Sequence, residues 1–120
     1  IRNNDGQVLL EKRPAKGLLA NMWQFPMVEL PTSNHTVEEL VEHDYGVEIE
    51  KGPVINEFKH VFSHLVWEME SFEAILIKEK EQTSACKWLT IEEINQQPMP
   101  VPMLKIWNAW KERKMLNDNK

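Results

Sequence analysis

The sequence predicts an α+β domain in which helices pack on a mixed β-sheet. Three observations support this class: apolar runs of strand length, two capping boxes that mark helix starts, and a helical apolar stripe near the C-terminus. The chain has 120 residues and neither an internal repeat nor a low-complexity segment. We therefore expect one domain over residues 1–120.

The N-terminal quarter predicts two short strands joined by a loop. The turn signal Asn-Asp-Gly occupies residues 4–6, and residues 7–13 after it have the composition of a strand. Pro-Ala-Lys-Gly at residues 14–17 ends this strand. Trp23 and Phe25 lie two residues apart, which places both side chains on one face of a second short strand, where we expect them in the core.

A helix is predicted next. Thr36 and Glu39 have the spacing of a capping box, in which each side chain binds a backbone amide of the first turn. Gly46 supplies the left-handed residue that commonly ends a helix. Beyond it we expect a short strand at residues 47–50 and a turn at residues 51–53, where Lys-Gly-Pro interrupts the strand pattern.

Two strands and a bend form the centre of the chain. Residues 54–60 predict one strand and residues 65–77 a second, which is long enough that we expect a bulge near Ser71. Phe-Ser-His at residues 62–64 then forms the tip of a hairpin, where a hydroxyl and an imidazole stand side by side. A strand pair can hold such a tip rigidly toward a ligand, which favours a recognition site here.

The C-terminal part predicts a short strand and two helices. Residues 86–89 have strand composition, and Thr90 with Glu93 forms the capping box of a one-turn helix. Three prolines within residues 96–102 argue against regular helix there, so we expect the last helix from Met103 onward. The apolar stripe of this helix comprises Met103, Ile106, Trp107 and Trp110.

Composition narrows the compartment and the class of function. No apolar run reaches the roughly 18 residues of a membrane span and no signal peptide opens the chain, so we expect no membrane contact. The single cysteine, Cys86, provides neither a disulfide framework nor an iron–sulfur site, which fits a reducing cytosol. The net charge of −5 argues against tight DNA binding by this chain alone, because phosphate contacts need a basic face.

The order of these elements resembles the Nudix family, in which a mixed β-sheet lies between helices in an α/β/α sandwich. The family's signature, G-x5-E-x7-R-E-U-x-E-E-x-G-U, gathers carboxylates around a divalent metal for pyrophosphate cleavage. With Gly46 as its second glycine, the three metal-ligand positions of the helix include one acid, Asp44. A shift by one residue recovers Glu39 and Glu42 but loses Gly46. We therefore expect the Nudix-like fold without its hydrolase chemistry.

A closer resemblance is to the C-terminal domain of the adenine DNA glycosylase (MutY) family, a relative of the Nudix fold. Residues 58–64, Phe-Lys-His-Val-Phe-Ser-His, fill every position of that family's F-[K/R]-H-x-[F/L]-[S/T]-H motif. Residues 17–26 are similar to its G-L-W-x-x-L-W-x-F-P, with Leu19 in place of a Trp and Asn21 in place of a small residue. Residues 102–107 resemble the start of its last helix, which begins with proline.

This resemblance implies a reader of 8-oxoguanine in DNA base-excision repair. The family removes adenine mispaired with 8-oxoguanine, and its N-terminal domain carries the catalytic residues and an iron–sulfur cluster. We therefore expect no catalytic residue, cofactor or metal here, and two partners: double-stranded DNA with an 8-oxoguanine:A pair, and the protein's own N-terminal catalytic domain. The opening Ile1 fits a piece of such a larger, cytoplasmic bacterial enzyme, although a short disordered start would look the same.

The resemblance further implies that Phe62, Ser63 and His64 contact the lesion. 8-Oxoguanine differs from guanine at its Hoogsteen edge, where N7 becomes a donor and C8 gains a carbonyl. Ser63 offers an acceptor and a donor in one hydroxyl, and His64 can donate from a ring nitrogen. Phe62 can wedge into the opened duplex or anchor the hairpin, and Ser63 can instead satisfy only the local backbone.

Other groups near the tip leave further alternatives open. His60 and His64 could act as metal ligands with Glu57, but the spacing supplies no third nitrogen or sulfur ligand, so we expect His60 to be a hydrogen-bonded structural residue beneath the turn. Four cations either form a phosphate-binding rim near the lesion or are scattered solvated charge: Lys12, Arg13, Lys16 and Lys59.

Two rival functions remain at this point. One is an active Nudix pyrophosphohydrolase that acts on free nucleotides such as oxidised dGTP. The other is a protein-interaction module that uses the C-terminal helix, which an exposed patch of Trp107 and Trp110 would favour.

Overall fold

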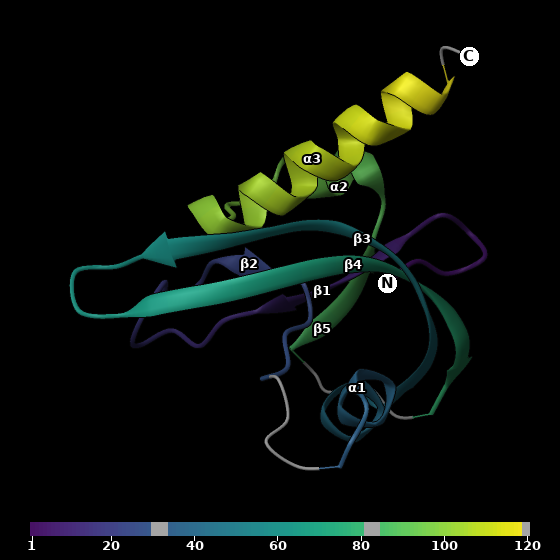
Figure 1. Ribbon diagram of the computed structural model, residues 1–120, viewed down its shortest axis with the longest axis horizontal. Coiled ribbons are helices and arrows are strands. Elements are labelled where there is room, and N and C mark those ends of the chain that lie inside the picture. The colour runs from purple at the N-terminus through teal and green to yellow at the C-terminus, as the bar shows by residue number, and fades with distance from the viewer. Residues whose placement is uncertain (30–33, 81–84, 119–120) are drawn as a thin grey trace.

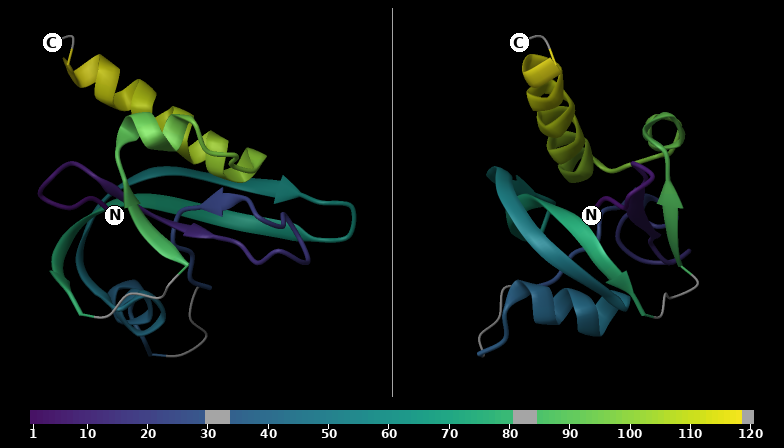
Figure 2. Two further views of the ribbon diagram at one scale, coloured as in Figure 1. Left: turned by 180° about the vertical axis from the view of Figure 1, so that it is seen from behind. Right: turned by 90° about the vertical axis from the view of Figure 1, so that its right-hand side faces the viewer.

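The computed structural model describes residues 1–29, 34–80 and 85–118, with side chains up to residue 116 (Figure 1). Its elements, in chain order, are β1 (Val8–Lys12), β2 (Trp23–Gln24), α1 (Val37–Tyr45), β3 (Val47–Val61), β4 (Val66–Glu79), β5 (Cys86–Leu89), α2 (Ile91–Asn95) and α3 (Val101–Asp118). The strands lie in a middle layer, with α2 and α3 on one side and α1 on the other (Figures 1 and 2). The predicted α/β/α arrangement is confirmed.

The strands form two groups. β1 lies between β2 and β5 and pairs antiparallel with both, while β3 and β4 form a long antiparallel hairpin. The parallel pairing that makes the arrangement mixed is a bridge between Arg2 and Ile75 of β4. The hairpin reaches beyond α3 and β2 at its closed end, so its tip stands clear of the body of the molecule (Figure 1).

β1 is buried on both faces, which explains its unbroken apolar run. Val8 and Leu10 point to the core beneath α3, and Leu9 points to a second core beneath α1. Leu9 and Leu10 are fully buried. A strand covered by helices on both sides needs apolar residues at every position, not only at alternate ones.

α3 supplies much of the larger core. The predicted stripe is confirmed, since Met103, Ile106, Trp107 and Trp110 are all buried. The two indoles therefore form no exposed patch of the kind that would favour an interaction module. The predicted start at Met103 was wrong, because α3 begins at Val101. Pro102 fits there, since an N–H in the first turn has no partner within the helix. No described helix is long and apolar enough to span a membrane.

Both predicted capping boxes are present. The Thr36 hydroxyl accepts the Glu39 amide at 3.2 Å, and the Glu39 carboxylate accepts the Thr36 amide at 3.3 Å. The same reciprocal bonds join Thr90 and Glu93 at the start of α2. Gly46 ends α1 with φ 67°, a left-handed conformation that glycine adopts at little cost. These short-range features were legible in the sequence because they involve neighbours in the chain.

The predicted turn at residues 51–53 was wrong, because β3 continues through it from Val47 to Val61. The chain passes as a bulge, in which three steps along β3 match two along β4. A bulge on a strand with a single neighbour tolerates Pro53, which has no N–H to donate. Gly52 fits closely here, since a Cβ on it would lie 3.0 Å from the carbonyl oxygen of Glu73.

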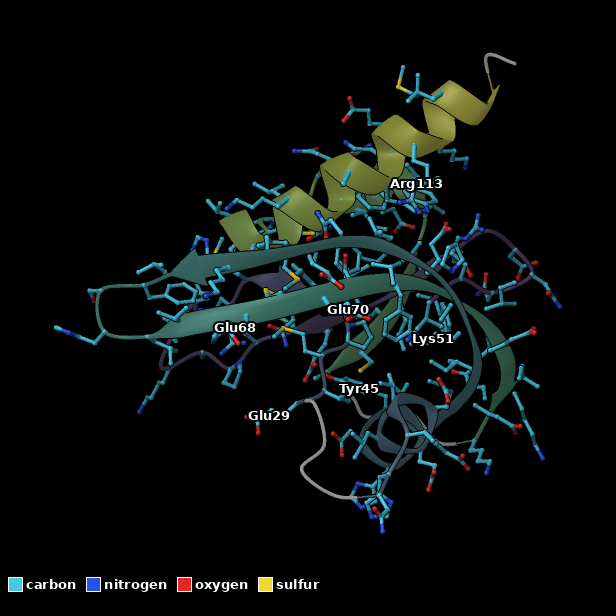
Figure 3. All side chains as sticks on the ribbon, in the orientation of Figure 1. Glu29, Tyr45, Lys51, Glu68, Glu70 and Arg113 are labelled. Carbon is cyan, nitrogen blue, oxygen red and sulfur yellow. The ribbon has the colours of Figure 1, made fainter. Side chains whose placement is uncertain are left out.

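The predicted bulge near Ser71 is confirmed, although the extra residue belongs to the other strand. Opposite Ser71, β3 advances by two residues while β4 advances by one, and Ile55 is the additional residue. The carbonyl groups at this bulge accept from Arg113 of α3, whose Nη2 lies 3.0 Å from the Val54 oxygen and 3.1 Å from the Ile55 oxygen (Figure 3). The last helix is therefore attached to the hairpin where its ladder is interrupted.

Candidate functional site

The tip of the β3–β4 hairpin presents two polar side chains to solvent. The Phe62 amide donates to the Leu65 carbonyl at 2.7 Å, which closes a four-residue loop. Ser63 and His64 are both exposed within this loop. In the part of the chain that the structure describes, neither side chain forms a hydrogen bond with another protein group. The Ser63 hydroxyl thus forms no hydrogen bond with the local backbone. The Ser63 hydroxyl and the His64 imidazole are both available to a ligand.

Beneath the tip, three rings and a guanidinium form a continuous stack. The Phe62 ring lies edge-on to His60, with centroids 4.6 Å apart, and edge-on to Trp67, with centroids 4.9 Å apart. The guanidinium carbon of Arg13 lies 5.7 Å from the centroid of Trp67. Phe62 is half-buried in this stack, which favours the anchoring interpretation. His60 contacts the Phe62 ring, and among the described residues its side chain forms this ring contact and not the predicted hydrogen bond.

Arg13 connects this stack to the loop that follows β1. Its Nε donates to the Leu18 carbonyl at 2.9 Å, and its Nη1 donates to Oε1 of Gln24 at 2.7 Å. Gln24 is the one buried polar residue among those described, with 7% of its surface exposed. The sequence predicted Arg13 either as part of a phosphate-binding rim or as solvated charge, and it gave no indication of the contact with Trp67. The pairing of two residues so distant in the chain leaves no local signal.

The four cations of the predicted rim differ in exposure and in bonding partners. Lys12 and Lys16 are exposed on β1 and the loop after it, while Arg13 is half-buried and already bonded. Lys59 forms an ion pair with Glu68 at 3.3 Å. Among the four, the structure brings Arg13 alongside the rings beneath the tip.

The carboxylates of α1 have structural partners. Glu39 closes the capping box, and Glu42 accepts a hydrogen bond from Nζ of Lys80, which raises the pKa of that lysine. Asp44 lies 2.9 Å from Nδ1 of His43. Across the described ranges, no group of three or more His, Cys, Asp or Glu side chains is placed to hold a metal ion. The acids that a shifted Nudix register would recruit are therefore occupied in holding the fold together.

A cleft of about 690 Å³ runs beside β4, between that strand, the segment after β2 and α3. Arg13 and Trp67 are among its lining residues. Four carboxylates also line it, Glu29 from the segment after β2 and Glu68, Glu70 and Glu73 from β4. The first three are labelled in Figure 3. Glu70 has Lys51 at 3.9 Å as a partner. The cleft places an aromatic and a guanidinium, rather than a metal cradle, next to the hairpin.

A family model described as NUDIX domain matches residues 1–109. The chain belongs to the NUDIX domain family. This confirms the Nudix-like α+β fold that the order of elements predicted. A NUDIX hydrolase from Nitrosomonas europaea has the same fold, with a TM-score of 0.75 and 12% identity over 95% of this chain and 86% of that one.

Within the NUDIX family, the similarity extends to adenine DNA glycosylases. The rat adenine DNA glycosylase is 28% identical over 115 residues, which cover 89% of this chain and 22% of the rat protein. The human adenine DNA glycosylase is 28% identical over 116 residues, which cover 87% of this chain and 20% of the human protein. The chain thus spans about a fifth of the length of these curated relatives.

A solved structure supports the same relationship. The C-terminal domain of mouse MUTYH, in a complex with human PCNA, is similar with a TM-score of 0.57 and 25% identity. The match covers 90% of this chain and 77% of the mouse chain. The resemblance to the C-terminal domain of adenine DNA glycosylases, first indicated by the Phe-Lys-His-Val-Phe-Ser-His motif, is confirmed.

Proposed function

We propose that this chain is the lesion-recognition domain of an adenine DNA glycosylase that acts in base-excision repair on 8-oxoguanine:A pairs. The observation that carries the proposal is the hairpin tip, which presents the Ser63 hydroxyl and the His64 imidazole unbonded to other described groups. The similarity to adenine DNA glycosylases over 89% of the chain supports it. On this proposal residues 1–120 form a C-terminal domain.

The proposal assigns the chemistry of excision to a different part of the protein. An N-terminal domain would carry the catalytic residues and the iron–sulfur cluster, and this chain would supply recognition alone. Engagement of Glu39 and Glu42 by neighbouring groups supports a recognition role over hydrolysis of nucleotides. The protein would work in a bacterial cytoplasm, where chromosomal DNA and a reducing environment coincide.

The tip can distinguish 8-oxoguanine from guanine by hydrogen bonding. The Ser63 hydroxyl can accept from N7–H of the lesion, and the His64 ring or the Ser63 amide can donate to its C8 carbonyl. Guanine has an acceptor at N7 and no C8 carbonyl, so at least one group would stay unpaired. An unpaired polar group costs about 1–3 kcal/mol, which is about a 5- to 150-fold preference.

Affinity is expected to be weak for this chain alone. Its net charge is −5, and phosphate contacts supply most of the affinity of DNA-binding proteins. The catalytic domain would therefore hold the duplex while the hairpin tip reads the base. Specificity and affinity would then depend on different parts of the protein, and the ratio of two dissociation constants is the quantity to measure.

The test is a titration of the ¹⁵N-labelled chain with two short duplexes that differ only in carrying 8-oxoguanine:A or G:A. We expect the amides of Ser63 and His64 to shift with the lesion duplex, and the lesion duplex to bind about 5- to 150-fold tighter. The double variant Ser63→Ala/His64→Ala should lose this preference, whereas Asn108→Ala, on the exposed side of α3, should keep it. Equal binding of both duplexes by the unmodified chain would reject the proposal.

The same double variant can be examined in an intact glycosylase that contains this domain. In the intact enzyme the catalytic domain would supply the affinity for DNA. The excision rates on the two mispairs then report recognition of the lesion directly. We expect the preference for 8-oxoguanine:A over G:A to narrow, with the rate on G:A little changed. An unchanged preference would show that the tip does not read the lesion.

A further inference from the structure

We infer that Arg13 is a positioning residue that orients the hairpin tip through Trp67, and that it thereby sets the discrimination between 8-oxoguanine and guanine. This inference rests on the proposed function and goes beyond it by adding a residue that never touches the lesion. It also replaces the phosphate-rim role that the sequence suggested for Arg13.

The guanidinium of Arg13 is held on two edges. One donor binds the Leu18 carbonyl at 2.9 Å, and another binds Oε1 of Gln24 at 2.7 Å. Gln24 is itself fixed, because it is buried in β2 and its amide lies 3.4 Å from Oε2 of Glu11 on β1. Two directed hydrogen bonds define the plane of a guanidinium, and one of the two acceptors here is fixed in the core.

The guanidinium carbon lies over the indole of Trp67, and the indole in turn contacts Phe62 at the tip. The Arg13 carbon lies 5.7 Å from the Trp67 centroid, and Trp67 lies edge-on to Phe62 with centroids 4.9 Å apart. Phe62 directly precedes Ser63 in the chain. The ring that Arg13 supports is therefore one contact away from the residue proposed to read the lesion.

The β3–β4 ladder holds the tip up to its last pair, Val61 with Val66, and the contact between Arg13 and Trp67 adds a link from outside the hairpin. The hairpin projects beyond α3 and β2, and among the described residues no other helix or strand covers its closed end (Figure 1). Within the loop, the backbone bond described is the one from Phe62 to Leu65. His60 packs on Phe62 from the same strand and cannot relate the tip to the rest of the fold. The link through Arg13 joins the tip to β1 and β2, which belong to the core.

Two roles of Arg13, orienting the tip and contacting a phosphate by its charge, can be told apart by substitution. A lysine at residue 13 would keep the positive charge, but it has no plane to stack on an indole and cannot make two bonds in a fixed fork. A phosphate contact needs the charge above all, whereas an oriented stack needs the guanidinium. Arg13→Lys therefore distinguishes a positioning role from a phosphate contact with a single substitution at constant net charge.

The experiment compares Arg13→Lys with the unmodified chain and with Lys87→Ala, which removes an exposed cation on β5. Free-state amide shifts of Ser63 and His64 are recorded first, and the two duplexes are titrated next. We expect Arg13→Lys to displace both amides and reduce the lesion preference about fivefold or more, while its dissociation constant for the G:A duplex changes less than about twofold. Lys87→Ala should leave the amides and the preference unchanged.

A second variant keeps the test decisive if Arg13→Lys fails to fold. Trp67→Leu removes the other partner of the stack, and it should displace the same two amides and narrow the preference in the same way. Arg13→Lys with unmoved amides and full preference would overturn the inference, as would a folded Trp67→Leu with both unchanged. If the unmodified chain shows no lesion preference, the proposed function fails instead, and the free-state amide shifts still decide whether Arg13 positions the tip.

Discussion

The ring of Phe62 lies edge-on against the indole of Trp67, with centroids 4.9 Å apart and planes inclined by 73°. His60 contacts the other side of the same ring, with centroids 4.6 Å apart and planes inclined by 71°. In the free chain, Phe62 is thus an anchor that fastens the tip to its own strands. Wedging into DNA would require these two contacts to be given up.

Truncation of Phe62 should therefore destabilise the chain. Aromatic pairs contribute about 0.5–1.5 kcal/mol each beyond their buried area, so Phe62→Ala should lower the free energy of unfolding by about 1–3 kcal/mol. Val61→Ala is the matched control, because Val61 is 69% exposed and its loss should cost about 0.5 kcal/mol or less. Urea denaturation measures both. If the two variants are equally stable, the Phe62 ring is not an anchor, and the result would favour a role for Phe62 as a wedge in the duplex.

Removal of a core side chain from α3 should have a much larger effect. Met103 is fully buried between α3 and the strands, and Met→Ala substitutions in cores cost about 2–5 kcal/mol. Its neighbour Leu104 is 39% exposed, so Leu104→Ala should cost clearly less. Thermal unfolding of the two variants gives the comparison. Similar melting temperatures would contradict the observed placement of α3.

The two capping boxes predict a weakening of the chain in acid. Hydrogen bonds from the Thr36 and Thr90 amides lower the pKa values of Glu39 and Glu93 below their ordinary value of 4.5. A lowered pKa in the folded chain means that the stabilisation is present above pH 4.5 and is lost as the pH falls below it. Circular dichroism should record a loss of helix in that range.

Glutamine in place of Glu39 and Glu93 tests whether these two carboxylates cause the loss of helix in acid. Glutamine still accepts the capping hydrogen bonds but does not titrate, so Glu39→Gln/Glu93→Gln should reduce the loss of helix in acid. Glu112→Gln on α3 is the control, since Glu112 is exposed and closes no capping box. A pH profile identical in all three proteins would show that other carboxylates govern the acid transition.

The chain should not hydrolyse free nucleotides. Glu39 and Glu42, which a shifted Nudix register would make metal ligands, bind Thr36 and Lys80 instead. Incubation with Mg²⁺, dGTP and 8-oxo-dGTP should release no pyrophosphate or phosphate above a buffer control. Turnover that disappears in Glu39→Gln or Glu42→Gln would support the rival pyrophosphohydrolase and count against a recognition domain.

Short-range features were predictable from the sequence to within a residue or two. The capping box at Thr36, the left-handed Gly46 and the buried stripe of α3 depend on residues a few positions apart, so their chemistry is visible in the sequence. Strand continuity was less predictable. Lys-Gly-Pro at residues 51–53 has the composition of a turn, yet β3 runs through it because β4 can pair with a bulged strand.

The candidate site likewise has features that are local in the sequence and features that depend on the tertiary structure. The sequence by itself determined which residues form the tip, because the hairpin and its Phe-Ser-His motif are local. The tertiary structure decided which of them are available, leaving Ser63 and His64 exposed while Phe62 packs between two rings. It also brought Arg13 onto Trp67. This contact depends on how β1 and the hairpin pack together. The sequence around Arg13 and the sequence around Trp67 do not indicate it, because the two residues are far apart in the chain.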